Sequence, residues 1–331
     1  MSDVMSTVPA LNVERLIEQK CCLAIMGPTA SGKSRLSMAL AERFPVEIIS
    51  VDSALIYRGM DIGTAKPSAE ELAKVPHHLI DILDPSESYS AADFVEDVHR
   101  LVAEIFERGR LPMLVGGTMM YFNALQKGMA QLPSADEALR AEIHQAWLED
   151  AQAVHDRLKA VDPEAAERIH PNDPQRLVRA LEVYEMTGRP LTELQKEGQG
   201  AGLTAFKLVK VALLPEDRGQ LHQQIEERFH AMLNDGFLKE AETVFSQPGL
   251  HGDLPAIRSV GYRQAWLFFE QTYDYETFVE KSIVATRQLA KRQITWLRKE
   301  TDLHVIDPYH TNLDKSVEEV LEYLARCDKN A

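Results

Sequence analysis

Cysteine is scarce in this sequence, with three residues among 331, at Cys21, Cys22 and Cys327. Two of them are adjacent and no C-x-x-C pair occurs, so neither a disulfide framework nor a zinc site is indicated. No apolar run approaches the roughly 20 residues that a membrane-spanning helix needs. The first 20 residues contain three acidic side chains and no apolar leader segment, so we expect no signal peptide. These absences predict a cytoplasmic protein without a membrane partner, and no obligate protein partner is evident.

Basic residues are also few compared with acidic ones. The sequence has 36 lysines and arginines against 51 aspartates and glutamates, which gives a formal net charge of −15. This balance alone argues against a nucleic-acid partner. The range 281–299 is an exception, because it contains six basic residues and no acidic one. Charges more than about 10 Å apart are screened at ordinary salt, so the basic range 281–299 can bind a polyanion although the protein as a whole is acidic. The alternative is that these residues form the solvated face of a helix.

Residues 27–34 read Gly-Pro-Thr-Ala-Ser-Gly-Lys-Ser and follow a short apolar run. The spacing G-x-x-x-x-G-K-S is typical of a loop whose backbone N–H groups surround a diphosphate or triphosphate, with a helix beginning near Lys33. Lys33 adds a positive charge and Ser34 offers a hydroxyl as the Mg²⁺ ligand. The alternative is an ordinary glycine-rich turn. The predicted phosphate-binding residues are Gly27, Pro28, Thr29, Ala30, Ser31, Gly32, Lys33 and Ser34.

Two features of nucleotide-hydrolysing proteins with such a loop are missing. The apolar run 111–115 ends in Gly-Gly-Thr instead of an aspartate, and no N-K-x-D guanine-reading motif occurs. Asp52, after the apolar run 46–51, is the nearest acidic substitute; it could support the metal or, being ionised, accept a proton. Thr118 could donate to a phosphate oxygen. The alternatives are that Asp52 caps the following turn and that Thr118 caps a helix over 119–125.

The pattern of the chain predicts an α/β fold. Strand signals lie at 23–26, 46–51, 111–115, 206–214 and 303–306. Strands that alternate with helices along the first 125 or so residues predict a parallel sheet covered by helices, with ligands beyond the carboxyl ends of the strands. The clearest helix begins after Ser90 and stops at Gly109.

The range 131–201 lacks convincing strand signals. Helices are expected there after Ser134 and after Asp173, where Pro174 takes the first helical position, and the second of these helices ends at Gly188. The glycine-rich range 197–202 is expected to be a connection. We therefore predict a discontinuous P-loop core with a parallel sheet, formed by 1–130 plus 202–331. An all-helical domain at 131–201 is inserted into it.

Seven segments together resemble the signature blocks of the tRNA dimethylallyltransferase family, also called tRNA isopentenyltransferases. They occur in the family's order at 27–34, 52–67, 76–81, 116–121, 172–182, 258–264 and 291–298. Ser34 departs from the threonine common in the family, and its hydroxyl can do the same work. The resemblance implies transfer of a dimethylallyl group from dimethylallyl diphosphate to N6 of adenine 37, next to the anticodon of tRNA. The products are N6-dimethylallyladenosine and diphosphate.

The resemblance also implies roles for individual residues. The phosphate loop then holds the leaving diphosphate, with Mg²⁺ as the cofactor, and Lys33 stabilises the departing charge. Asp52 matches the group that deprotonates the attacking amine, and Thr118 matches a hydroxyl near the bridging oxygen. Arg228 matches an arginine that faces the diphosphate, although from sequence alone it would be an ordinary surface residue of a helix. The implied catalytic residues are thus Asp52, Thr118 and Lys33.

The implied macromolecular partner is the anticodon stem-loop of tRNA. An adenine must leave its stack to reach a buried electrophile, and base-specific recognition usually targets such loops. In a helix through 281–299 we expect a buried apolar stripe with basic residues around it, as phosphate contacts require. The residues expected to contact tRNA are Asp52, Ser53, Ala54, Leu55, Thr118, Arg140, Gln175, Arg176, Leu177, Val178, Arg179, Arg258, Ser259, Val260, Gly261, Tyr262, Arg263, Lys291, Arg292, Gln293, Ile294, Thr295, Trp296, Leu297 and Arg298.

Two other functions compete with this one. A small-molecule kinase would bind ATP with the same loop, and Arg176 and Arg179 would then belong to its lid. A non-catalytic phosphate-binding RNA chaperone would keep its function without Asp52. The donor that the protein requires, ATP or dimethylallyl diphosphate, separates the kinase from the prenyltransferase.

Overall fold

The computed structural model describes residues 11–128, 130, 132–198, 203 and 205–329. Its contacts divide the chain into two compact units. The core unit consists of Met1–Phe122 and Ala205–Ala331, and the helical unit consists of Asn123–Thr204. The predicted α/β class with a parallel sheet is confirmed.

A six-stranded parallel sheet forms the centre of the core unit, in the order β3-β2-β4-β1-β5-β6. The predicted strands are all present, with ends shifted by one or two residues, and the short β3 is additional. The four middle strands are almost wholly buried, because helices cover both faces of the sheet. The strands are β1 (Cys21–Met26), β2 (Val46–Val51), β3 (His77–His78), β4 (Leu111–Gly116), β5 (Lys207–Leu213) and β6 (Leu303–Ile306).

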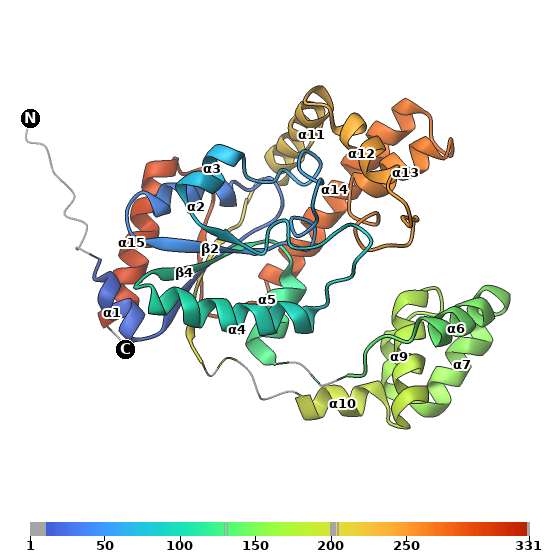
Figure 1. The fold of residues 1–331 in the computed structure, drawn as a ribbon. Helices are drawn as coiled ribbons and strands as arrows, with labels where there is room; N and C mark the ends of the chain where they lie inside the picture. The colour runs from blue at the N-terminus through green and yellow to red at the C-terminus, as the bar shows by residue number, and fades with distance from the viewer. Residues whose placement is uncertain (1–10, 129, 131, 199–202, 204, 330–331) are drawn as a thin grey trace, which may run out of the picture. The chain divides into compact units, whose positions relative to one another are not determined.

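The helices of the core unit lie on opposite sides of this sheet. Alternate strand residues such as Leu23 and Ile25 share one apolar core with α1, α2 and α15. Helix α4 lies on the other side, below β2 and β4 in Figure 1. The helices around the sheet are α1 (Val13–Glu18), α2 (Lys33–Ala41), α3 (Ala69–Lys74), α4 (Ala91–Glu107), α5 (Met119–Lys127, which crosses into the helical unit) and α15 (Leu313–Lys329).

Local sequence sets the ends of these helices. Ser90 accepts a hydrogen bond from the backbone N–H of Asp93 and starts α4, as predicted, and Gly109 follows its end with φ +67°. Gly32, with φ +86°, precedes α2, which begins at Lys33 as the phosphate-loop motif predicts. The amino end of α2 therefore points out of the carboxyl edge of the sheet.

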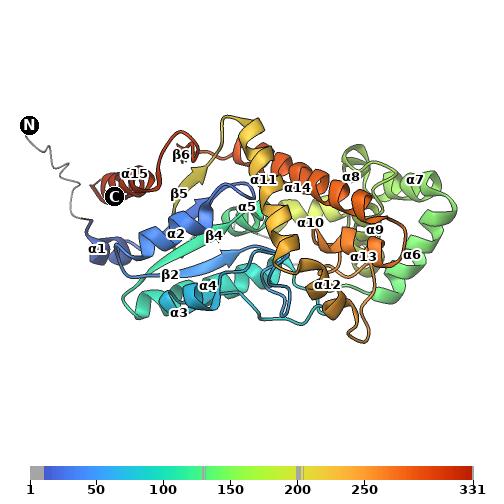
Figure 2. The same cartoon turned by 90° about the horizontal axis from the view of Figure 1, so that it is seen from above.

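A second apolar core holds four helices beside the carboxyl edge of the sheet, seen from above in Figure 2. They are α11 (Arg218–Asn234), α12 (Phe237–Phe245), α13 (Tyr262–Phe269) and α14 (Tyr275–Leu297). Their aromatic side chains, among them Phe237 and Tyr262, meet edge to face. Ile56, Tyr57 and Met60, from the segment after β2, are buried in the same core. This packing fixes the chain that follows Asp52.

The described residues of the helical unit form helices and no strand. The helices are α6 (Glu137–Glu149), α7 (Ala151–Val161), α8 (Pro163–Arg168), α9 (Pro174–Thr187) and α10 (Leu191–Gly198). Helix α9 begins after Asp173, with Pro174 first, and ends at Gly188, as predicted. The start of α6 differs from the prediction, because Asp136 rather than Ser134 accepts the capping hydrogen bond, from Leu139 N–H. Most of the connection expected at 197–202 lies outside the described residues.

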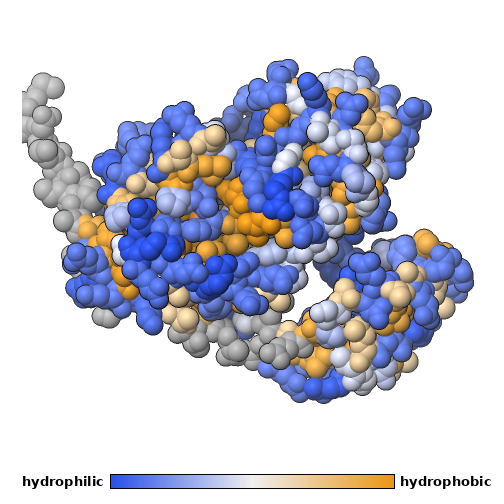
Figure 3. All heavy atoms as spheres, in the orientation of Figure 1, coloured by the Kyte–Doolittle hydropathy of each residue, from blue (hydrophilic) through white to orange (hydrophobic). Residues whose placement is uncertain are grey.

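Among the described residues, no helix combines the length and the apolar character that crossing a bilayer requires. On the face of the core unit drawn in Figure 3, hydrophilic residues predominate and apolar ones gather in patches.

A carboxylate is buried inside the helical unit. Glu182, on α9, is fully buried and accepts hydrogen bonds from Arg179 at 2.5 Å and from the backbone N–H of Asp136 at 2.7 Å. Arg140, on α6, forms an ion pair with it at 3.0 Å. Arg179 also donates to the carbonyl oxygen of Pro133 at 2.8 Å. A buried carboxylate needs such partners, and here they join α6 to α9.

Replacing Glu182 with alanine should therefore destabilise the protein. The substitution leaves two partly buried guanidinium groups and one backbone N–H without their acceptor, so we expect a loss of about 3 kcal/mol in the free energy of unfolding. Denaturant unfolding followed by circular dichroism measures it. The control is Glu185→Ala on the same helix, which removes an exposed ion pair with Arg157 and should cost less than about 1 kcal/mol. Equal losses in the two variants would contradict this role of Glu182.

Candidate active site

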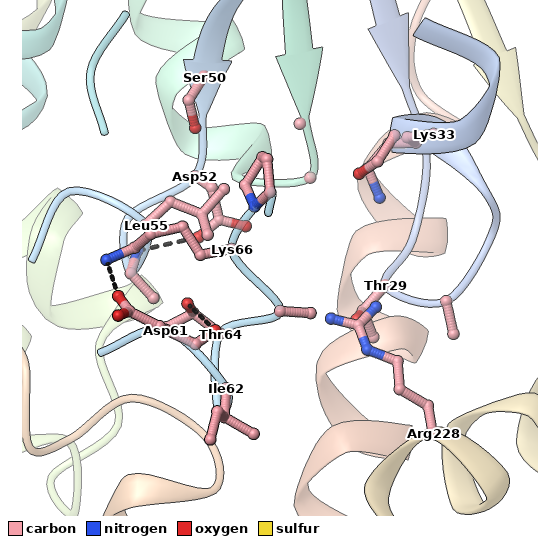
Figure 4. Close-up of a pocket in the computed structure, with 18 of the residues that line it drawn as sticks. Thr29, Lys33, Ser50, Asp52, Leu55, Asp61, Ile62, Thr64, Lys66 and Arg228 are labelled. Atoms are coloured by element: carbon pink, nitrogen blue, oxygen red, sulfur yellow. Dashed lines mark hydrogen bonds and ion pairs between the residues drawn. The ribbon is translucent and has the colours of Figure 1, made fainter. Parts of the chain in front are cut away.

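A cavity of about 970 Å³ opens at the carboxyl ends of β1, β2 and β4. The phosphate loop follows β1, Asp52 follows β2, and Gly117 follows β4, and residues of all three segments line the cavity. Parallel sheets place ligands at this edge, because the loops from neighbouring strands meet there. In Figure 4, Lys33, Thr29 and Arg228 lie on one side of the cavity, and Ser50, Asp52 and Lys66 lie on the other.

The phosphate loop is curled as its sequence predicts. Lys33 Nζ donates to the carbonyl oxygen of Pro28 at 2.7 Å, which closes the loop. The loop packs tightly, since a Cβ added at Gly27 would lie 2.6 Å from Ser31 Oγ and 2.8 Å from the carbonyl oxygen of Leu213. Ser31 Oγ is buried and has no hydrogen-bond partner among the described residues. A buried hydroxyl without a partner is costly unless a ligand satisfies it.

Two cations of the cavity are partly buried. Burial lowers the pKa of Lys33 to about 8; the negative charge of Asp52 opposes this shift and the positive charge of Arg228 adds to it. Burial also lowers the pKa of Arg228, again opposed by Asp52. Arg228 comes from α11, so the helical layer beside the sheet supplies the second cation. A diphosphate could accept hydrogen bonds from both cations at this end of the cavity, next to the phosphate loop.

Asp52 is held in a defined orientation. Its Oδ1 accepts a hydrogen bond from the backbone N–H of Ala54 at 2.9 Å, which is the turn-capping role that the sequence also allowed. Its Oδ2 takes part in no hydrogen bond within the described residues. The capping bond thus fixes the side chain and leaves an oxygen for a ligand.

Thr118 joins the ends of β2 and β4. Its Oγ1 accepts from the backbone N–H of Ser53 at 3.1 Å, and its own backbone N–H donates to Val51 at 3.1 Å. A Cβ at Gly116 would lie 2.0 Å from the carbonyl oxygen of Val51, so only glycine fits at this crossing. The hydroxyl proton of Thr118 can still donate to a ligand, because the oxygen serves as the acceptor.

Sequence reasoning missed several residues of this cavity. Ser50 Oγ is buried without a partner among the described residues and lines the cavity two positions before Asp52, on the same face of β2. Lys66 donates to the carbonyl oxygen of Tyr57 at 2.9 Å and pairs with Asp61 and Asp81. Period-two spacing from Asp52 could have identified Ser50, whereas the partners of Lys66 needed the fold.

Glu240 holds the far wall of the cavity and was also missed. From α12 it accepts hydrogen bonds from the backbone N–H groups of Asp61, Ile62 and Gly63, at 2.9, 2.7 and 3.0 Å. Tyr262 O–H donates to the same carboxylate at 2.5 Å. No local motif signals these contacts, because 177 or more positions separate Glu240 from Asp61, Ile62 and Gly63.

The residues expected to contact tRNA fall on different surfaces. On α14, Lys291, Arg292, Thr295 and Trp296 are exposed and line a shallow hollow of about 400 Å³. Gln293, Ile294 and Leu297 are buried in the same helix, which ends at Leu297. The buried apolar stripe expected in this helix is present and consists of Ile283, Ala290, Ile294 and Leu297.

The other expected tRNA contacts are likewise divided. Ser259, Val260 and Gly261 line the cavity, Tyr262 is buried, and Arg263 donates to the carbonyl oxygen of Gly252 at 2.7 Å. In the helical unit, Gln175 and Arg176 are exposed, and Arg176 pairs with Asp173. Leu177 and Val178 lie in the core of that unit, and Arg140 and Arg179 bind Glu182.

Comparison with known proteins identifies the family. Residues 55–300 match the family described as IPP transferase. The chain belongs to the IPP transferase family. The tRNA dimethylallyltransferase of Hydrogenovibrio crunogenus is 77% identical over 322 residues, which cover 97% of this chain and 99% of that protein. The tRNA dimethylallyltransferase of Alkalilimnicola ehrlichii is 58% identical over 84% of this chain and 87% of its own length. The family predicted from the signature blocks is confirmed.

Solved structures of IPP transferases share the fold. The tRNA isopentenylpyrophosphate transferase of Bacillus halodurans is 38% identical with a TM-score of 0.69, over 94% of this chain and 97% of that one. A eukaryotic dimethylallyltransferase acting on tRNA is 28% identical with a TM-score of 0.74, over 89% of this chain and 75% of that one.

The low pKa of Lys33 makes anion binding by this IPP transferase dependent on pH. The ammonium form exists below the pKa of about 8 and is lost above it, so affinity for dimethylallyl diphosphate without tRNA should fall about tenfold from pH 7 to pH 9. Calorimetric titration at each pH measures this affinity. Asp52→Asn removes the charge that supports the ammonium, so its decline should begin at lower pH. Constant affinity from pH 7 to pH 9 would contradict the assignment.

Proposed function

We propose that the protein transfers the dimethylallyl group of dimethylallyl diphosphate to N6 of adenine 37 in tRNA and releases diphosphate. One observation carries the proposal. In a single cavity, the phosphate loop with Lys33 and Arg228 faces a carboxylate, Asp52, that is fixed at the end of β2, with β4 between that strand and β1. This arrangement supports the separation of an anionic leaving group from a proton acceptor, which alkylation of an amine requires. Membership of the IPP transferase family favours it over phosphoryl transfer from ATP.

Departure of the diphosphate is the step that the cations stabilise. The bond between C1 of the dimethylallyl group and the bridging oxygen breaks, and its electron pair goes to the diphosphate. Lys33 and Arg228 would bind the growing negative charge in a partly buried space, where an ion pair is stronger than in water. Backbone N–H groups at the start of α2 and the buried hydroxyl of Ser31 would complete this binding.

Asp52 would act on the nucleophile. The exocyclic amine of adenine forms the new bond to C1 with its nitrogen lone pair, and the proton that it loses passes to the carboxylate. The hydrogen bond from Ala54 N–H orients Asp52 for this transfer. Thr118, which accepts a hydrogen bond from Ser53 N–H, would donate a hydrogen bond from its hydroxyl to the bridging oxygen.

The oxygen donors at the phosphate loop suit Mg²⁺. Ser34 is exposed at the start of α2 and lines the cavity, and Asp52 lies across it with one oxygen outside any hydrogen bond of the described chain. Magnesium prefers such hard oxygen ligands together with phosphate oxygens, and it would neutralise part of the leaving group's charge. We therefore propose Ser34 as a Mg²⁺ ligand.

The tRNA would contact exposed residues from several elements. On α14, Lys291 and Arg292 offer charge and Trp296 offers a face for stacking, with 41% of its surface exposed. Ser259 and Gly261 line the cavity and would contact the flipped adenine there. Gln175 and Arg176 are the exposed members of the set in the helical unit. Arg140 and Arg179 would contact RNA only while they also hold Glu182.

The exchange Asp52→Asn tests the proposed base. Asparagine keeps an oxygen to accept the bond from Ala54 N–H, so the turn survives while the proton acceptor is lost. We expect turnover to fall by roughly 10²–10⁴ with tRNA affinity nearly unchanged. Mass spectrometry of nucleosides, after incubation with unmodified tRNA, Mg²⁺ and dimethylallyl diphosphate, measures the product. Turnover equal to that of the parent protein would refute the role of Asp52.

A further inference from the structure

Gln293 connects three separate parts of the core unit through its side-chain amide. It lies on α14 and is 9% exposed. Its Oε1 accepts a hydrogen bond from the backbone N–H of Thr29 in the phosphate loop, at 2.8 Å. Its Nε2 donates to the carbonyl oxygen of Gly117, after β4, at 2.9 Å. A single amide therefore uses an acceptor and a donor to join the loops after β1 and β4.

The fit around this amide is close. A Cβ at Gly117 would lie 2.4 Å from Gln293 Nε2 and 2.9 Å from the carbonyl oxygen of Gly27. Strands β1 and β4 are neighbours in the sheet, so their loops leave the same edge side by side. Gln293 lies where these loops meet, and its orientation requires both an oxygen and an N–H group at the end of the side chain.

The same connection extends to the proposed proton acceptor. Gly117 precedes Thr118, whose hydroxyl accepts from Ser53 N–H, and Ser53 follows Asp52. The chain of contacts thus runs from the diphosphate cradle through Gln293 and Thr118 to the base. The separation between these groups determines whether the electrophilic carbon and the amine can meet, and a misplacement of about 1 Å can cost 10²-fold in rate.

We propose that Gln293 is a positioning residue that holds the phosphate loop at a fixed distance from Thr118 and Asp52. The inference rests on the prenyl transfer proposed above and differs from the direct tRNA contact that the sequence suggested for Gln293. The buried side chain and its two bonds to backbone groups favour positioning over RNA contact. The exposed neighbours of Gln293 on α14 remain the proposed RNA contacts.

Two substitutions separate the two bonds. Gln293→Glu keeps the acceptor for Thr29 but sets an oxygen against the carbonyl oxygen of Gly117, and Gln293→Met removes both bonds at similar length. At pH 8 we expect the single-turnover rate with saturating tRNA and dimethylallyl diphosphate to fall about 10²-fold in both variants. For Gln293→Met, the affinity for tRNA should stay within about threefold of the parent value, because the exposed residues of α14 are unchanged. The affinity of Gln293→Glu for dimethylallyl diphosphate should fall at pH 8, because the new carboxylate lies beside the phosphate loop and repels the anion.

The pH profile gives a signature that loss of stability alone would not produce. Burial beside a carbonyl oxygen raises the pKa of the introduced carboxyl, and its protonated form can donate to Gly117 again. The rate of Gln293→Glu relative to the parent protein should therefore rise about tenfold as the pH falls from 8 to 6. The relative rate of Gln293→Met should stay constant. The control is Gln223→Glu, the same chemical change at an exposed position of α11, which should keep the parent rate.

Several outcomes would overturn the proposal. Rates equal to the parent rate in both variants would do so, as would weaker tRNA binding with an unchanged rate at saturating tRNA. A lower melting temperature with an unchanged rate would assign Gln293 a role in stability alone. If the rate of Gln293→Glu relative to the parent protein does not change with pH, loss of the hydrogen bond to Gly117 is not the cause of the lower rate. Failure of the parent protein itself to prenylate tRNA would instead refute the proposed function.

Discussion

The close approach of two cations, Lys33 and Arg228, is the constraint on which the site depends. Lys33 and Arg228 come from helices on different layers and share a space in which burial lowers the pKa of both. Asp52 opposes both shifts, so the proposed proton acceptor also stabilises the cations when no substrate is bound. A diphosphate would take over that task and release Asp52 to act on the amine. Lys33, Arg228 and Asp52 would therefore interact with one another before the substrate binds and with the substrate afterwards.

The sheet brings these charges together by bonds between backbone and side chains. The loops after β1, β2 and β4 are tied through Gln293 and Thr118, and glycines at 116 and 117 permit the close approach. On the opposite wall, Glu240 accepts hydrogen bonds from three successive backbone N–H groups of the segment after β2. Lys66, in the same segment, donates to the carbonyl oxygen of Tyr57. Such a site is built into the structure before the substrate arrives, which is what electrostatic catalysis requires.

Much of this could be predicted from sequence, because the signals are local. The phosphate loop, the buried strands and the caps at Ser90 and Asp173 each depend on residues within a few positions of one another. The two-residue β3 was missed since it is too short to show a hydrophobic pattern. The start of α6 was misplaced because serine and aspartate cap equally well, and the contact between Asp136 N–H and Glu182 comes from a helix distant in the chain.

Long-range contacts explain the remaining differences. A basic helix predicts exposed charge, but only the packing of α14 shows that Gln293 turns inward while Arg292 and Trp296 face solvent. Arg140 and Arg179 similarly have the residue type expected of an RNA surface, whereas the fold pairs them with a buried carboxylate. The phosphate loop predicts a bound diphosphate or triphosphate but not the organic group attached to it. The dimethylallyl group was predicted from the resemblance of the signature blocks to the family.

The central claim is that the cradle binds the diphosphate of an isoprenoid donor rather than a nucleoside triphosphate. Parallel incubation of the protein and unmodified tRNA with dimethylallyl diphosphate or with ATP, followed by mass analysis of the anticodon stem-loop, tests it most directly. We expect one added dimethylallyl group on adenine 37 with the isoprenoid donor and no need for ATP. Unchanged RNA with that donor, together with transfer of the terminal phosphoryl group of ATP to a small acceptor, would contradict it.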